Sequence, residues 1–145
     1  MCLEIAMEIR AADASDANDL FELNALFDNT TTVEQMKKSL RENDREIVCI
    51  AFCEGAAVGY CSGLIVESMC HSEKRADIEA LYVREEYRKQ GVGEALMRCL
   101  EELLALRGIR HFHINTYLSN KTAQLLYEKM GYAKTGEILM DKTAT

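Results

Sequence analysis

The strongest constraint on the fold is a change in the spacing of apolar residues near the middle of the chain. From Ala76 to Val83, apolar and polar residues alternate well enough to predict a strand of a sheet. From Gly93 to Leu104, apolar residues recur at helical spacing, and Gly108 follows as a residue suited to end a helix. A strand and a long helix therefore follow one another, joined by a short turn that contains glycines.

The same patterns along the rest of the chain predict six strands and four helices in all. Strands are expected over about 7–11, 46–52, 57–66, 76–83, 111–117 and 132–140. Helices are expected over about 15–27, 31–43, 93–107 and 120–130. The order β-α-α-β-β-β-α-β-α-β predicts an α/β (α+β) domain with a mixed central sheet and helices on its faces.

Particular residues mark the ends of these predicted elements. Thr31-x-x-Glu34 is a capping-box pattern for the second helix, and residues 53–56 are expected to form a hairpin turn. Ser119 or Asn120 is expected to cap the last helix, and Gly131 to end it.

Composition agrees with one soluble domain. Hydrophobic residues make up 48% of the 145 residues, so we expect a single domain over 1–145, with 1–6 as a flexible N-terminal extension. The net charge of −7 has the wrong sign for a protein that binds nucleic acid through its phosphates. No apolar run approaches the roughly 18 residues of a membrane span, so we expect a cytoplasmic protein that does not enter the membrane.

The six cysteines do not indicate a metal site. Cys49 and Cys53 share one face of a predicted strand, where small apolar side chains fit, so we expect buried free thiols. No Cys-x-x-Cys pair or second Cys/His pair accompanies Cys70 and His71. We therefore expect no bound metal.

The turn between the central strand and its helix has the composition of an anion site. Gly91 and Gly93 let a phosphate approach the backbone at the positive end of the following helix, and Arg88 and Lys89 add positive charge. A dinucleotide-binding turn would need a glycine three residues after Gly93, where Leu96 stands, and the Gly-Lys-Ser/Thr of a Walker loop is absent.

Two motifs carry a resemblance to a known family. Arg88-Lys89-Gln90-Gly91-Val92-Gly93 matches the turn Arg/Gln-x-x-Gly-x-Gly/Ala, and residues 120–132 match an Asn, an Ala and then Leu-Tyr-Glu-Lys-x-Gly-Tyr. With these motifs the chain resembles a small, single-domain member of the GCN5-related N-acetyltransferase (GNAT) superfamily over essentially its whole length. The resemblance implies the acyl-CoA N-acyltransferase fold, in which two parallel central strands splay apart, here 77–83 and 111–117.

The resemblance also implies acetyl-CoA as cosubstrate, bound in the cleft between the splayed strands. An extended amide-bearing arm needs backbone donors and acceptors in line, and a pyrophosphate needs N–H groups and positive charge. Asn120 is implied to bond the pantetheine region, and it can cap the last helix as well. The residues implied to bind acetyl-CoA are Leu81, Tyr82, Val83, Arg88, Lys89, Gln90, Gly91, Val92, Gly93 and Asn120.

The implied reaction is direct attack of an amine on the thioester in a ternary complex. Tyr127 stands at the family position of the general acid that protonates the departing thiolate, and an N–H near Leu81 would polarise the thioester oxygen. For the general base we select Glu79, with Asp77 or water as the alternatives that the sequence leaves open.

The predicted acceptor is the primary amine of a small cationic molecule. In this family the acceptor is recognised by the early helices and a loop between the middle strands, where acidic residues here form a candidate rim. The alternatives are a protein or peptide N-acetyltransferase and a CoA-binding regulatory module without catalysis. Homodimerisation, frequent among such proteins, is left open by the sequence. The rim residues are Asp28, Glu34, Glu67 and Glu73.

Overall fold

The computed structural model describes residues 6–27 and 30–145. The chain divides into two compact units, Met1–Asn115 and Thr116–Thr145, and each is described by itself. The expected single domain over 1–145 stays a prediction. The expected N-terminal extension lies, except for Ala6, outside the described residues.

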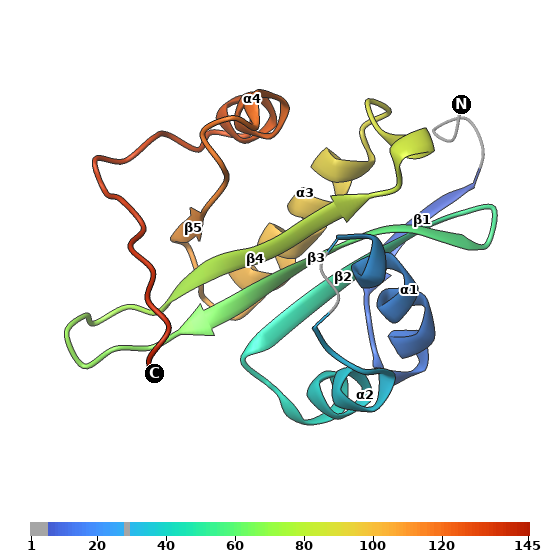
Figure 1. Ribbon diagram of the computed structural model, residues 1–145, viewed down its shortest axis with the longest axis horizontal. Coiled ribbons are helices and arrows are strands. Elements are labelled where there is room, and N and C mark those ends of the chain that lie inside the picture. Colours follow the sequence, from blue (N-terminus) through green and yellow to red (C-terminus); the bar gives the residue numbers. More distant parts are fainter. Residues whose placement is uncertain (1–5, 28–29) are drawn as a thin grey trace. The chain divides into compact units, whose positions relative to one another are not determined.

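The first unit is built on a five-stranded mixed sheet (Figure 1). The spatial order is β1-β2-β3-β4-β5; the first four strands pair antiparallel, and β4 and β5 pair parallel. This confirms the predicted mixed sheet. The strands are β1 (Met7–Ala11), β2 (Glu46–Cys53), β3 (Ala56–Val66), β4 (Arg75–Val83) and β5 (Phe112–Ile114).

Helices cover both faces of this sheet. Helices α1 (Ala17–Phe27) and α2 (Val33–Glu42) lie on one face, and α3 (Val92–Leu106) lies on the other (Figure 1). Short 3-10 turns precede α1 and α3 at Ala14–Asp16 and Glu85–Tyr87.

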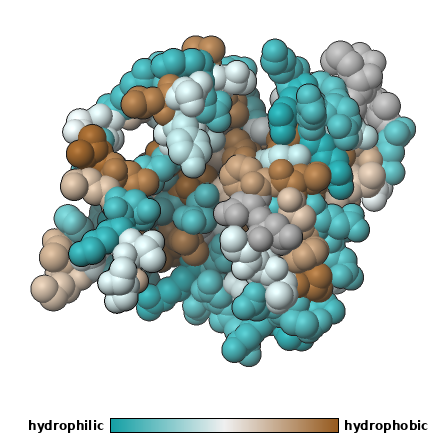
Figure 2. All heavy atoms as spheres, in the orientation of Figure 1, coloured by the Kyte–Doolittle hydropathy of each residue, from teal (hydrophilic) through white to brown (hydrophobic). Residues whose placement is uncertain are grey.

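Apolar side chains of the helices fill the space against the sheet. Helix α3 buries Leu96, Met97, Leu100 and Leu104 completely, in agreement with their helical spacing. On the opposite face, Leu20 and Leu23 of α1 join Ile50 and Tyr60 in a buried cluster. Helix α2 buries no residue fully, and hydrophilic side chains cover its outer surface (Figure 2).

Local capping explains where the helices begin and end. The capping box of α2 is formed by Thr32 and Gln35, one residue later than the predicted pair Thr31 and Glu34. At the end of α3, Gly108 has a φ of +79°, which favours glycine, and its N–H and that of the next residue donate to carbonyls of the last helical turn.

The second unit contains α4 (Lys121–Lys129). Asn120 caps it, because its Oδ1 accepts the Ala123 N–H at 3.1 Å, and Gly131 follows its end with a φ of +98°. The predicted closing strand over 132–140 is wrong, since that segment forms no strand in the described chain. A segment forms a strand only where a partner strand takes up its main-chain N–H and C=O groups.

The cysteines depart in part from the expectation of free thiols. Cys53 is disulfide-bonded, so the expectation is wrong for this residue. Cys49 and Cys61 are buried and free, and the Cys49 Sγ lies 3.5 Å from the Cys99 Sγ on α3. Burial raises the pKa of the Cys99 thiol to about 12, so this thiol is neutral near pH 7.

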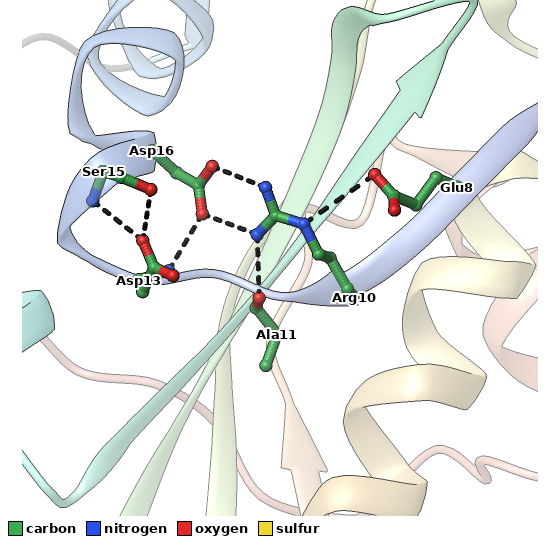
Figure 3. Close-up of polar contacts among 6 residues, drawn as sticks. All are labelled: Glu8, Arg10, Ala11, Asp13, Ser15 and Asp16. Atoms are coloured by element: carbon green, nitrogen blue, oxygen red, sulfur yellow. Dashed lines mark hydrogen bonds and ion pairs between the residues drawn. The ribbon is translucent and has the colours of Figure 1, made fainter.

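An ion pair joins β1 to the turn before α1 (Figure 3). Two guanidinium nitrogens of Arg10 each lie 2.8 Å from an oxygen of Asp16, and the Asp13 N–H donates to Asp16 at 2.9 Å. The Arg10 guanidinium holds the pKa of the Asp16 carboxyl below its ordinary value. Asp16 is buried, so the pair fixes the direction in which the chain leaves the sheet.

Candidate active site

Pairing between β4 and β5 stops well before β4 ends. The parallel register ends at the pair Ile78 and Ile114, whereas β4 continues to Val83. Within the described residues, the segment 80–83 is therefore paired on the β3 side only. Strand β5 is also shorter than the predicted strand over 111–117. The resulting open edge agrees with the predicted splay of the two parallel strands.

A β-bulge lies at the start of this open edge. Ile78 pairs with Gly63 of β3 and Ala80 pairs with Ser62, so Glu79 is an extra residue of β4 without a partner on β3. A bulge of this kind turns neighbouring side chains and reverses the alternation of the strand.

The bulge decides which main-chain groups face the open edge. Before it, the Ala76 N–H donates toward β5 at 3.0 Å, and after it the Arg84 N–H donates to a β3 carbonyl at 2.8 Å. Main-chain groups alternate in direction along a strand. The N–H and C=O groups of Leu81 and Val83 therefore face the open edge, whereas those of Tyr82 face β3.

The turn after β4 brings its main-chain N–H groups to the start of α3. Gly91 has a φ of +84°, and Lys89 has a φ of +61°, a conformation that residues other than glycine rarely adopt. Among the described residues, the N–H groups of Lys89, Gly91, Val92 and Gly93 donate to no acceptor of the protein. They lie at the positive end of α3, an arrangement that suits an anion.

Side chains of the turn hold it against the end of β4. The Arg88 Nε donates to the Val83 carbonyl at 2.8 Å, and the guanidinium carbon lies 5.5 Å from the centre of the Tyr82 ring. The Gln90 amide donates to a carbonyl of the 3-10 turn at 3.1 Å. Arg88 and Lys89 are exposed, so both bring positive charge to the surface of the turn.

The two candidate carboxylates on β4 have different surroundings. The Asp77 carboxylate accepts the Arg75 Nε at 3.0 Å and lies 3.8 Å from the His113 Nδ1. Glu79 is exposed and forms no ion pair with any residue that the structure describes. Arg84, the other neighbouring cation, donates its Nε to a carbonyl of β3 at 3.0 Å instead.

The remaining predicted site residues lie in the second unit. Asn120 caps α4 through its side-chain oxygen, which leaves its amide N–H groups as donors for another acceptor. Tyr127 is half-buried on α4, and its ring lies 6.0 Å from the ring of Tyr132.

A pocket of about 180 Å³ opens on the α1 and α2 face of the sheet. Leu20, Met36, Leu40 and Val48 supply its apolar walls. The consecutive residues Glu79 and Ala80 both line it, as the bulge allows. Its remaining lining residues are the polar Asn24, Ser39, Glu46, Tyr60 and Ser62.

Glu46 is a polar residue of this pocket that the sequence did not single out. Its carboxylate accepts the Ser62 hydroxyl at 2.5 Å and the Ser39 hydroxyl at 3.2 Å. The Tyr60 hydroxyl donates to the Asn24 side-chain oxygen at 2.7 Å. These contacts join β2, β3, α1 and α2, so no local pattern in the sequence could reveal them.

Two of the four residues of the predicted acidic rim form ion pairs with nearby lysines. Glu34 lies 3.8 Å from Lys37, and Glu67 lies 3.9 Å from Lys74. Glu73 is exposed, and Asp28 lies outside the described residues.

In the described chain, no helix has both the length and the apolarity that crossing a membrane requires.

An open strand edge followed by a glycine turn at a helix N-terminus defines the class of acyl-CoA N-acyltransferase folds that the sequence predicts. A family model described as the acetyltransferase (GNAT) family matches residues 14–132. The chain belongs to this family. The predicted family and fold are thereby confirmed.

Named relatives and solved structures agree with this assignment. N-acetyltransferase 8 of Homo sapiens is 29% identical over 107 residues, which are 74% of this chain and 47% of that protein, so the chain spans about half of it. A Bacillus subtilis (strain 168) relative, provisionally named as a ribosomal protein bS18 alanine N-acetyltransferase, is 29% identical over 88% of this chain and 82% of its own.

Among solved structures, that of AAC(6')-Iy in complex with the bisubstrate analog CoA-S-monomethyl-acetylneamine has a TM-score of 0.83. It is 19% identical and covers 97% of this chain and 99% of its own, a likeness that shows the fold.

Proposed function

We propose that this protein transfers the acetyl group of acetyl-CoA to a primary amine of a small cationic molecule. The observation that carries the proposal is the set of main-chain N–H groups of Lys89, Gly91, Val92 and Gly93, which donate to no acceptor in the described chain. Such groups at a helix N-terminus suit a pyrophosphate, and the exposed Arg88 and Lys89 add charge.

The open edge of β4 supports the same cosubstrate. Leu81 and Val83 direct main-chain groups away from β3, where the amides of an extended pantetheine arm can pair as a further strand would. The Val83 carbonyl is already taken by Arg88, so Leu81 and the Val83 N–H are the groups left for this pairing. Acetyl-CoA, when bound, supplies the activated thioester.

Residues of the protein would then accept the proton of the amine and stabilise the charge that develops on the thioester oxygen. An alkylammonium has a pKa near about 10, so it must lose a proton before it attacks. Glu79, which has no counter-ion among the described residues, is the base that we propose, since Asp77 is engaged with Arg75. The Leu81 N–H would stabilise the developing oxyanion.

Tyr127 is the proposed general acid for the departing thiolate, and Asn120 a proposed ligand of the pantetheine region. Replacement of Tyr127 by Phe removes only a hydroxyl, so acetyl-CoA binding should persist while turnover falls at least about tenfold. Turnover equal to that of the unaltered enzyme would remove Tyr127 from this role.

Acetyl-CoA binding is tested by the shift in thermal unfolding temperature on its addition. We expect a rise, because a ligand of the folded state stabilises it. Gly91→Glu should abolish this rise, since it places bulk and negative charge in the turn at a φ of +84°. Gly136→Ala, at a site with no atom within 4 Å of the added carbon, is the matched control. Absence of a shift in the unaltered protein would contradict the proposed function.

A protein or peptide N-acetyltransferase is the second candidate, and the name of the Bacillus subtilis relative favours it. A thiol-release assay that compares free amines with peptides bearing a free N-terminus or lysine separates the two candidates. Turnover of peptides alone would replace the small-molecule proposal.

A further inference from the structure

The pocket between α1, α2 and the sheet has a composition that a cation would complement. Its lining includes two carboxylates, Glu46 and Glu79, and no lysine, arginine or histidine. Neither carboxylate takes part in an ion pair within residues 6–27 and 30–145. Glu79 is exposed, whereas Glu46 is half-buried, and a carboxylate that is partly removed from water is favourable only where hydrogen bonds or a bound cation compensate it.

Glu46 is held in a fixed orientation. The hydroxyls of Ser39 and Ser62 each donate to a different oxygen of its carboxylate. Each oxygen can accept a further hydrogen bond, because a carboxylate oxygen has two lone pairs. An ammonium group, which carries three donors and a full charge, would satisfy this remaining capacity.

The volume and the apolar walls of the pocket limit the size and the chemistry of a ligand that can enter it. A pocket of about 180 Å³ corresponds to about six water-sized groups, and its walls at Leu20, Met36, Leu40 and Val48 are apolar. A short alkyl chain with amines at its ends fits both facts. A set of linked sugar rings is too large to enter this pocket.

The two carboxylates lie at different ends of the available space. Glu46 stands on β2 and Glu79 on β4, with β3 between them, so their strands are about 10 Å apart. One ammonium cannot serve as counter-ion for both at full strength. Two ammonium groups joined by a few methylenes can.

We infer that the acceptor is a linear diamine or polyamine whose alkyl chain occupies this pocket. This inference rests on the proposed function, in which Glu79 takes the proton of the amine that is acetylated. Glu46 binds the second ammonium, which is not acetylated, and so acts as a specificity-determining residue. Ser39 and Ser62 are positioning residues for its carboxylate.

The test measures binding of 1,4-diaminobutane and of n-butylamine to the full chain by calorimetry, with and without CoA. We expect the diamine to bind at least about tenfold more tightly, which is one further charge-assisted contact. Glu46→Gln should remove most of this preference. Glu42→Gln, an exposed change near the end of α2, should leave it intact.

A second variant covers the case in which Glu46→Gln does not fold. Ser39→Lys leaves Glu46 in place and introduces an ammonium on α2, at the residue whose hydroxyl contacts the Glu46 carboxylate, and lysine is a good helix former. It should weaken diamine binding about as much, with an unchanged circular dichroism spectrum. In the acetylation assay, Glu46→Gln should raise KM for the diamine about tenfold, with kcat little altered, because it removes binding alone.

Equal binding of the two amines, or undiminished diamine binding in Glu46→Gln and Ser39→Lys, would overturn the inference. The acetyl-CoA shift in unfolding temperature is read in the same samples. A normal shift without diamine preference refutes the acceptor assignment alone, and diamine binding at Glu46 without that shift refutes the proposed function alone.

Discussion

Replacing Asp16 by Asn should destabilise the protein through a single buried contact. The Asp16 side chain is 5% exposed and accepts two hydrogen bonds of 2.8 Å from Arg10, whose own side chain is 39% exposed. Asparagine keeps the shape but turns an amide donor toward the guanidinium donors. Loss of one partner of a buried ion pair costs about 3–5 kcal/mol, and hydration of the half-exposed Arg10 lowers our expectation to about 2–3 kcal/mol.

Urea unfolding at pH 7 measures this change in the free energy of unfolding. The midpoint should fall while the slope stays constant, and the unfolding temperature should drop by about 5–10 °C. The matched control is Glu8→Gln, because Glu8 lies 3.8 Å from Arg10 with a side chain that is 67% exposed. The control should change stability by less than about 0.5 kcal/mol.

The dependence on pH gives the stricter test. The pKa of Asp16 is lowered in the folded state, so its contribution is complete above the unfolded-state value near about 3.9 and is lost as the pH falls through the folded-state pKa. The difference between the unaltered protein and Asp16→Asn should therefore be constant from pH 8 to about 5 and shrink below about pH 4. A difference under about 0.5 kcal/mol, or one that does not change with acidification, would refute the reasoning.

Two further predictions concern β4. Gly59→Ala should destabilise the protein by about 1–3 kcal/mol in urea unfolding, because the added carbon would lie 2.8 Å from the Tyr82 carbonyl oxygen; a loss no larger than that of Gly136→Ala would contradict this. Glu79→Gln should lower kcat/KM for the acceptor amine about 100-fold near pH 7, with recovery toward the pKa of the amine. Asp77→Asn should have a much smaller effect, since Asp77 is paired with Arg75, and equal losses in the two variants would exclude Glu79 as the base.

Local signals explain why much of the fold could be predicted. The hairpin after β2 turns at Glu54 and Gly55, which both have positive φ, as a tight turn between paired strands requires. Gly108 and Gly131 follow their helices in the left-handed conformation that their positions predict. Each of these choices depends on a few neighbouring residues, so a single sequence contains them.

The errors have non-local causes. The capping box of α2 lies one residue later than predicted, because Thr31 and Thr32 are each followed three residues later by a suitable partner, Glu34 or Gln35. The sequence predicts a strand over 132–140, but whether a strand forms depends on a partner elsewhere. The contacts of Glu46 likewise depend on residues 7 and 16 positions away.

The bulge at Glu79 lies between the two parts of the candidate site, which are the pocket on the α1 and α2 face and the open edge of β4. This bulge was not predicted from the sequence. The run from Ala76 to Val83 is predicted as one regular strand, and the extra residue appears only in its pairing with Ser62 and Gly63 of β3. The same insertion that brings Glu79 and Ala80 to the pocket turns the main chain of Leu81 to the open edge. The proposed base at the pocket and the N–H proposed to stabilise the oxyanion therefore follow from one irregularity, and a regular strand could supply only one of them.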